Sequence, residues 1–239
     1  MSSRMERKKL RNDICTIPVV EVFEINDGCP ICRMYNTVEE RIITYIMGDA
    51  MMEPDVRIET NKLGFCPEHL NNMMTRRGRL QLALMLESHI KEIDSGIFQP
   101  KVFNSSDKKA DKCETLTESC FICNKIEWGF SRMFETIYRC YENEKTFRDM
   151  FNSQTQFCMP HYHRLIKGID KHKNPKYGKE MKENLTRITH EYLKSLCNDT
   201  SKYCSMYDYR NAASKDADWG NSKDSVERTV AFLTGKISK

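Results

Sequence analysis

The chain has 239 residues, of which 30% are charged and 39% hydrophobic, and its formal net charge is +4. This composition is typical of a globular protein of one large or two small domains, and the charge alone is too small to indicate nucleic-acid binding. No apolar run approaches the ~18–20 residues that cross a membrane, so we expect no membrane partner.

Residues 1–20 are interpreted as an N-terminal extension. Its first nine residues are polar and basic, and the apolar core of a signal peptide does not follow them, so we expect a cytoplasmic protein. Val19 and Val20 form the best strand candidate in the chain. Eleven cysteines in a chain without an export signal indicate metal binding or redox chemistry rather than disulfides.

Helical periodicity dominates after residue 20 and predicts an all-α protein with long packing helices. Glu53 and Pro54 suit a helix start, while Gly64, Gly96 and Gly235 suit helix ends. The predicted helices include residues 38–46, 53–64, 80–96, 126–137, 147–151, a long helix opening at 174–175, and a last one over 226–235.

A pair of cysteines, followed later by a cysteine and a histidine, occurs twice in the chain. In both copies the cysteines of the first pair are three positions apart, and a C-x2-H motif with Phe just before it follows after 33 or 34 residues. The first set is Cys29, Cys32, Cys66 and His69, and the second is Cys120, Cys123, Cys158 and His161.

Three thiolates and one imidazole form the ligand set of a closed, four-coordinate zinc site. We therefore predict two zinc ions per chain, each held within one set. A C-x2-C on a tight turn and a C-x2-H at a helix start would give a treble-clef-like arrangement. The alternatives are an iron–sulfur cluster, one site made by both C-x2-C pairs, or core cysteines without a metal. No catalytic motif is present, so neither catalytic nor cofactor-binding residues are predicted.

The duplication extends beyond the ligands. Aligning the two sets, with one residue inserted before Phe157, pairs Arg41 with Arg132, Glu53 with Glu144, Arg57 with Arg148 and Asn61 with Asn152. We infer an internal repeat of roughly 90 residues, longer than solenoid periods. The repeated Glu and Arg indicate either an anion site or an i, i+4 pair that supports one helix.

This repeat predicts two tandem zinc-stabilised helical modules. The first module covers residues 21–98 and the second 119–200. Residues 99–118 are polar and are interpreted as a linker, and 201–239 as a C-terminal helical segment. His163 could replace a ligand but has no counterpart in the first module, so we expect it on the surface.

The chain resembles an uncharacterised bacterial family known only as a domain of unknown function. The resemblance covers residues 21–236 and is carried by C-P-I-C-R at 29–33, E-P-D-V-R at 53–57, G-F-C-P-E-H-L at 64–70, the Leu-rich 80–86 helix, the second C-x-I-C and C-x2-H, and F-L-T-G at 232–235. It implies a fold and a bacterial origin but no activity. Some members carry a transporter-component label, which the missing export signal does not support.

Three functional hypotheses remain. The first is a non-enzymatic zinc protein with an interaction or regulatory role, whose partner is a protein rather than nucleic acid. The second is a thiol or metal sensor, in which oxidation ejects zinc. The third is an enzyme with a site between the repeats. We expect mild peroxide to leave both ions bound and to oxidise first the cysteines outside the two sets, Cys15, Cys113, Cys140, Cys197 and Cys204.

Overall fold

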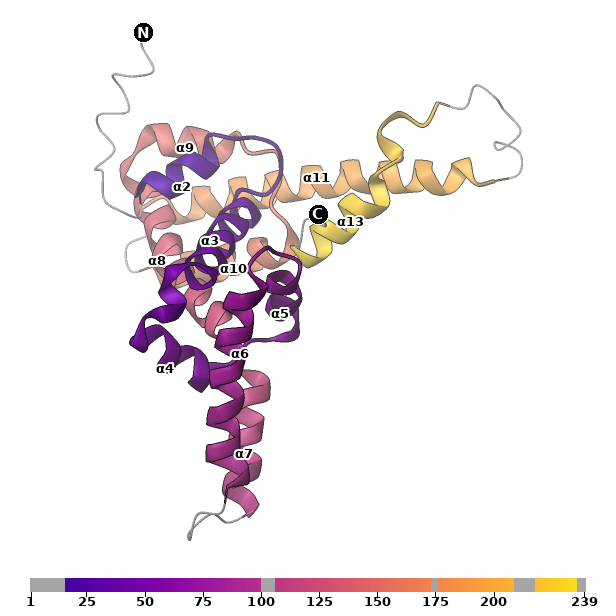
Figure 1. Cartoon of the computed structure of the whole chain (residues 1–239). Helices are drawn as coiled ribbons and strands as arrows, with labels where there is room; N and C mark the ends of the chain where they lie inside the picture. The colour runs from indigo at the N-terminus through magenta and orange to yellow at the C-terminus, as the bar shows by residue number, and fades with distance from the viewer. Residues whose placement is uncertain (1–15, 100–105, 173–175, 209–217, 236–239) are drawn as a thin grey trace. The chain divides into compact units, whose positions relative to one another are not determined.

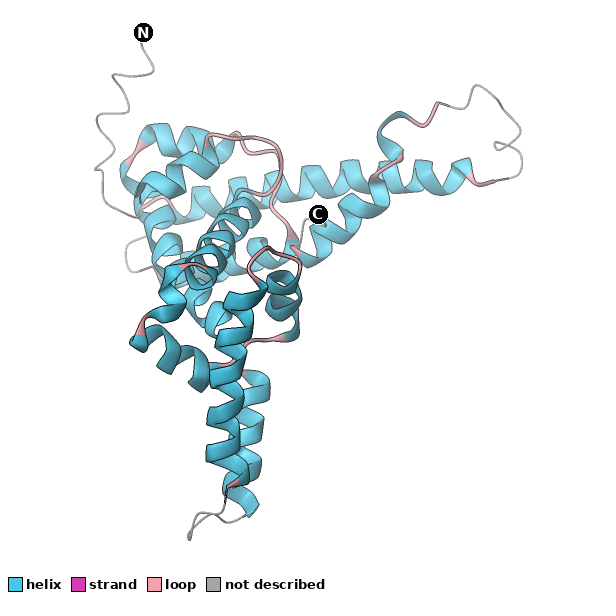
Figure 2. Cartoon of the chain, viewed as in Figure 1, coloured by secondary structure: helices cyan, strands magenta, loops and turns pink. Residues whose placement is uncertain are grey.

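The computed structural model describes residues 16–99, 106–172, 176–208 and 218–235. All regular structure in these ranges is helical (Figures 1 and 2), which confirms the predicted all-α class. Cys15 and the predicted helix opening at 174–175 lie outside the described residues.

The strand predicted at Val19 and Val20 is wrong, because these residues belong to helix α2 (Thr16–Phe23). Val19, Val22 and Phe23 are buried at helical spacing. The Phe23 ring packs 5.0 Å from Phe147 of α9 (Lys145–Asn152). Burial of one helical face therefore outweighs the strand preference of β-branched residues.

Several helix boundaries follow the sequence signals. Helix α4 (Pro54–Leu63) begins with a proline, and Gly64 ends it in a positive-φ conformation that favours glycine. Gly235 likewise ends α13 (Ser225–Thr234) in the left-handed region. Gly96 ends no helix, because α6 (Arg79–Ile93) continues into a π-helical turn, η3 (Asp94–Phe98).

The remaining elements are α3 (Pro30–Met47), η2 (Asp49–Met52), α5 (Pro67–Met74), α7 (Ser106–Glu118), α8 (Phe121–Asn143), α10 (Met159–Lys171), α11 (Gly178–Met206) and η4 (Gly220–Ser222). Helix α7 occupies most of the polar stretch interpreted as a linker. The helical pattern of α8 begins directly after Cys120, as that of α3 begins directly after Cys29.

The chain divides into two compact units that interleave along the sequence. We call residues 1–35 with 131–239 the terminal unit, and residues 36–130 the central unit. The chain passes between the units within α3 and within α8. Each unit therefore contains parts of both repeats: the terminal unit holds the first C-x2-C and the second C-x2-H, and the central unit holds the other two motifs.

The terminal unit has an aromatic core. Phe23, Phe147, Phe151 and Phe157 are almost fully buried, and the rings of Phe151 and Phe157 lie 5.1 Å apart. In the same unit, α11 and α13 pack together (Figure 1). The Tyr192 ring of α11 lies 5.7 Å from the Phe232 ring of α13.

The central unit has a more aliphatic core. Helix α6 packs on α4 and α5, and Met73, Leu82 and Met85 are buried there. Phe65, the residue before Cys66, is buried and its ring lies 6.4 Å from that of Phe121. The phenylalanine before each C-x2-H motif is thus a core residue beside the ligand pair.

Candidate metal centres

All four ligand pairs lie at the N-terminal end of a helix. In each pair the first cysteine directly precedes the helix or caps it, and the second ligand lies in the first turn. Proline occupies an early position in three of these helices, where its missing N–H costs nothing. The helices are α3 for Cys29 and Cys32, α5 for Cys66 and His69, α8 for Cys120 and Cys123, and α10 for Cys158 and His161. The positive end of each helix favours thiolates there.

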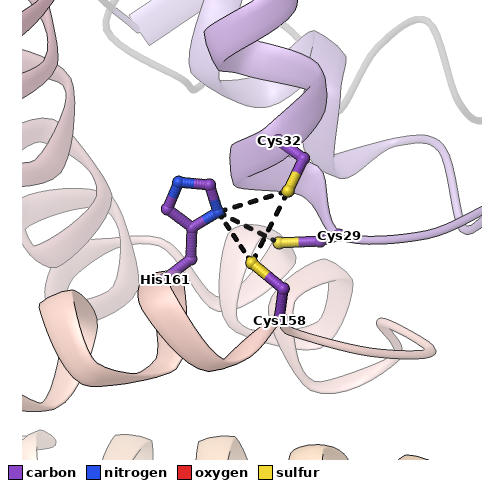
Figure 3. Close-up of side chains that lie close together, drawn as sticks. All are labelled: Cys29, Cys32, Cys158 and His161. Carbon is purple, nitrogen blue, oxygen red and sulfur yellow. Dashed lines mark hydrogen bonds between the residues drawn. The ribbon is translucent and has the colours of Figure 1, made fainter. Parts of the chain in front are cut away.

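The first group, which we call the terminal site, consists of Cys29, Cys32, Cys158 and His161. The ligand atoms from α3 and α10 point toward one another, and the imidazole presents Nδ1 to the sulfurs (Figure 3). Nδ1 of His161 lies 3.6 Å from Cys29 Sγ, 3.3 Å from Cys32 Sγ and 3.0 Å from Cys158 Sγ. The sulfurs of Cys32 and Cys158 are 3.5 Å apart.

The second group, which we call the central site, consists of Cys66, His69, Cys120 and Cys123. Nδ1 of His69 lies 3.0 Å from Cys66 Sγ and 3.4 Å from both Cys120 Sγ and Cys123 Sγ. Cys66 Sγ and Cys123 Sγ are 3.9 Å apart. In each site the four ligand atoms lie within 4.8 Å of one another, so each forms a complete Cys3His set.

The eight predicted residues gather into two groups that could hold a metal ion, but the predicted pairing of the motifs is wrong. Cys29 and Cys32 share a site with Cys158 and His161, not with Cys66 and His69. The alternative of one site made by both C-x2-C pairs is also wrong. Helix α3 explains the exchange: its 18 residues carry the chain about 27 Å at ~1.5 Å per residue. A hairpin would bring the chain straight back to the first pair, whereas this helix leads away from it.

The expected tight turn at each C-x2-C is also replaced by a helix start, because α3 begins at Pro30 and α8 at Phe121. The ligand motifs thus lie in both repeats, between Cys29 and His161. The chain belongs to DUF6062, a family of unknown function. The family model matches residues 10–239. No curated protein and no solved structure is detectably similar to it. The resemblance inferred from the motifs is confirmed, and the family supplies no activity.

In this DUF6062 protein all three cysteines of the terminal site are shielded from solvent. Cys29, Cys32 and Cys158 are 3–4% exposed. The Cys32 thiol donates to the carbonyl of Gly235, 3.1 Å away at the end of α13. A Cβ atom at Gly235 would lie 3.3 Å from Cys158 Sγ, so the close approach of the α13 end to this site suits glycine.

The central site is more open. Cys120 and His69 are buried, but Cys66 is half-buried and Cys123 is exposed. The Glu39 carboxylate lies 3.1 Å from Nε2 of His69. A carboxylate on the distal nitrogen of a ligating histidine fixes the ring orientation and raises its basicity. The sequence analysis did not single out Glu39. Its counterpart in the second repeat, Phe130, is buried, which indicates that this position of the repeat faces inward.

The surroundings of His69 favour a positive charge. Burial lowers its pKa, but hydrogen bonding to Cys120 and the carboxylate of Glu39 outweigh burial and raise the pKa to about 10. Burial raises the pKa of the Cys120 thiol, yet the hydrogen bond with His69 lowers it to about 6. The cluster thus stabilises an imidazolium beside a thiolate, a charge arrangement that a divalent cation can replace.

The other histidines and cysteines of the described ranges lie outside both sites. His163 and His190 are exposed, His89 contacts the carbonyl of Asn61, and His172 lies 3.4 Å from Glu142. Of the remaining cysteines in the described ranges, Cys140 is buried, and Cys113, Cys197 and Cys204 are exposed. None of the described helices is both long and apolar enough to cross a membrane.

The repeated arginine has a structural partner in the second repeat. Nη1 of Arg148 donates to the carbonyls of Tyr141 and Glu142, 2.8 and 3.0 Å away, in the last turn of α8. Its guanidinium also stacks on the Tyr177 ring. In the described residues no ion pair joins Arg148 to Glu144, so Arg148 closes the end of α8 instead of pairing along α9.

Proposed function

We propose that this chain is a non-enzymatic zinc protein, in which two structural zinc ions join the repeats and the helical surfaces serve an interaction or regulatory role. The observation that carries the proposal is a complete Cys3His set in each unit. Four protein ligands fill a tetrahedral zinc site and leave no open position for substrate. Three thiolates also favour zinc over metals that prefer oxygen ligands.

The distances support this metal. Two thiolates at ~2.3 Å and a nitrogen at ~2.05 Å from a tetrahedral zinc would lie about 3.8 Å (S–S) and 3.5 Å (S–N) apart. One S–S distance in each site, 3.5 and 3.9 Å, and the six S–N distances, between 3.0 and 3.6 Å, can be compared with these values. Every one lies within about half an ångström of the ideal value.

Each ion would connect segments that are remote in sequence. Cys32 and Cys158 are 126 positions apart, and Cys66 and Cys123 are 57 apart. Closing such loops costs chain entropy, which metal binding offsets. The modest net charge favours a protein partner over nucleic acid, and we propose a cytoplasmic setting, where reduced thiolates persist.

Two double variants test both the metal and the pairing. Zinc content is measured by elemental analysis on protein purified without chelator. In Cys32→Ser with Cys158→Ser, both changes fall in the terminal site, so we expect one ion per chain. In Cys32→Ser with Cys66→Ser, one change falls in each site, so we expect none. Pairing within each repeat would give the reverse result, and wild-type protein without zinc would refute the proposal.

A thiol-based sensor is the second candidate function. The observation that favours it is the exposure of Cys123, because redox-active cysteines need access to their oxidant. It concerns the central site alone, since the cysteines of the terminal site are buried. An enzymatic role has no comparable support, because the eight ligands fill both sites.

A further inference from the structure

Cys32 and Cys123 occupy the same position in the two repeats, and their surroundings differ. Both are the second cysteine of a C-x2-C, in the first turn of a long helix. Cys32 is 3% exposed, whereas Cys123 is exposed. Cys32 and Cys123 therefore have the same side chain at the same helix position and differ in their access to solvent.

Helix α13 accounts for the difference. Its last turn brings the Gly235 carbonyl to 3.1 Å from Cys32 Sγ, and packing against α10 and α11 holds the helix there. Phe232, 4% exposed, is the main apolar contact of α13 in this packing. The helix that follows the first repeat, α7, packs instead against α4 and η3, and Cys123 stays exposed.

A second thiol lies next to Cys123. Cys66 Sγ is 3.9 Å away and is itself only half-buried. An exposed thiolate with a neighbouring thiol is the arrangement in which a sulfenic acid condenses to a disulfide. Cys113 on α7 is also exposed but belongs to neither site, so it is an internal reference for exposure alone.

We propose that Cys123 is an oxidative modification site, at which peroxide releases the central zinc and leaves the terminal zinc bound. This inference rests on the zinc binding proposed above and identifies the site and residue that would sense the oxidant. It replaces our expectation from sequence that both ions would resist mild peroxide, because Cys123 is exposed.

The chemistry balances with hydrogen peroxide as the oxidant. The Cys123 thiolate attacks one peroxide oxygen, the O–O bond breaks, and the departing hydroxide takes up a proton to form water. The Cys66 thiolate then attacks the sulfenic sulfur, an S–S bond forms, and a second hydroxide leaves as water after protonation. Two thiolates lose one electron each, the peroxide is reduced to two waters, and the zinc loses two of its four ligands.

The test begins with full-length protein that carries two zinc ions. Low peroxide is added, released zinc is followed with a chromophoric chelator, and oxidised cysteines are identified by peptide mass spectrometry. We expect the first ion to leave at least about tenfold faster than the second, because only one site has an exposed thiolate. A Cys66–Cys123 disulfide should accompany it, and a thiol reductant with added zinc should restore the second ion.

Variants separate exposure from ligand chemistry. Phe232→Ala should loosen α13 and make release of the terminal zinc approach the rate of the central zinc. Leu233→Ala, an exposed neighbour on the same helix, should leave the rates unchanged, as should Cys113→Ser. If Phe232→Ala loses the terminal ion before oxidant is added, Gly235→Ala takes its place, since it disturbs the cover and keeps Phe232.

The outcomes distinguish the two proposals. Protein that holds no zinc overturns the proposed function and this inference together. Protein that holds two ions, and releases both at one rate or neither, overturns the inference and leaves structural zinc intact. Fast release of one ion without oxidation of Cys123 also overturns it.

Discussion

The terminal and central sites have the same ligands at the same helix positions but different surroundings. In the terminal site the C-terminal helix α13 reaches Cys32, and every cysteine is buried. In the central site Cys123 is exposed, and the additional partner is the Glu39 carboxylate on His69. The comparison teaches that the motif determines whether a metal can bind, and that elements outside the motif determine how accessible its ligands are.

The largest expected effect comes from removing a ligand. Metal binding contributes roughly 10 kcal/mol or more in small zinc domains, so each loss should unfold its own unit. Cys158→Ser should abolish hydrogen-exchange protection in the terminal unit, including α2 at the far end of the sequence, and spare α4 to α6. Cys66→Ser should abolish protection in the central unit, including α4 to α6, and spare the terminal unit. The comparison would fail if Cys158→Ser destabilised only residues after 118, as two modules in sequence order would require.

The next effect concerns Glu39 and should be confined to the central site. Replacing a carboxylate that orients a ligating histidine typically lowers metal affinity by about 10–100-fold. Glu39→Gln should therefore lower the zinc affinity of the central site by that factor, as measured in a competition with a chelator. Glu40→Gln is the matched control, because the neighbouring Glu40 pairs with Arg76. If Glu39→Gln lowered the zinc affinity of both sites equally, Glu39 would not act through His69 of the central site.

The sequence identified the candidate ligand pairs because they are local features. Each pair needs only three or four residues and a helix start, and Pro67 after Cys66 marks such a start directly. The pairing is a tertiary property. A gap of 33 or 34 residues is compatible with closure inside a repeat or between repeats, and only the path of α3 and α8 decides.

The surroundings of the sites were partly within reach of sequence analysis. Alignment with the core residue Phe130 indicates that Glu39 faces inward, although not that it meets His69. Gly235 was predicted as a helix end, and the structure confirms this. The contact between the Gly235 carbonyl and the Cys32 thiol depends on how α13 packs on α10 and α11, and no local sequence pattern specifies that packing. The helix at Thr16–Phe23 was missed because its short apolar run suits a strand equally well.

The smallest effect expected is that of Gly235→Ala, and it should appear only in the terminal site. Gly235 has φ 71°, where an L-residue costs about 1–2 kcal/mol. The added Cβ would also lie 3.3 Å from Cys158 Sγ and 3.4 Å from Pro160 Cγ, so the end of α13 must shift slightly. We expect a thermal transition lowered by a few degrees, with both ions retained.

Gly129→Ala is the matched control for this change, because Gly129 lies within α8 in open space. Alanine is the better helix former there and should be neutral or slightly stabilising. If Gly235→Ala were equally neutral, the end of α13 would not press on the terminal site. The shielding of Cys32 would then need another source, and the structural difference between the two sites would lose its explanation.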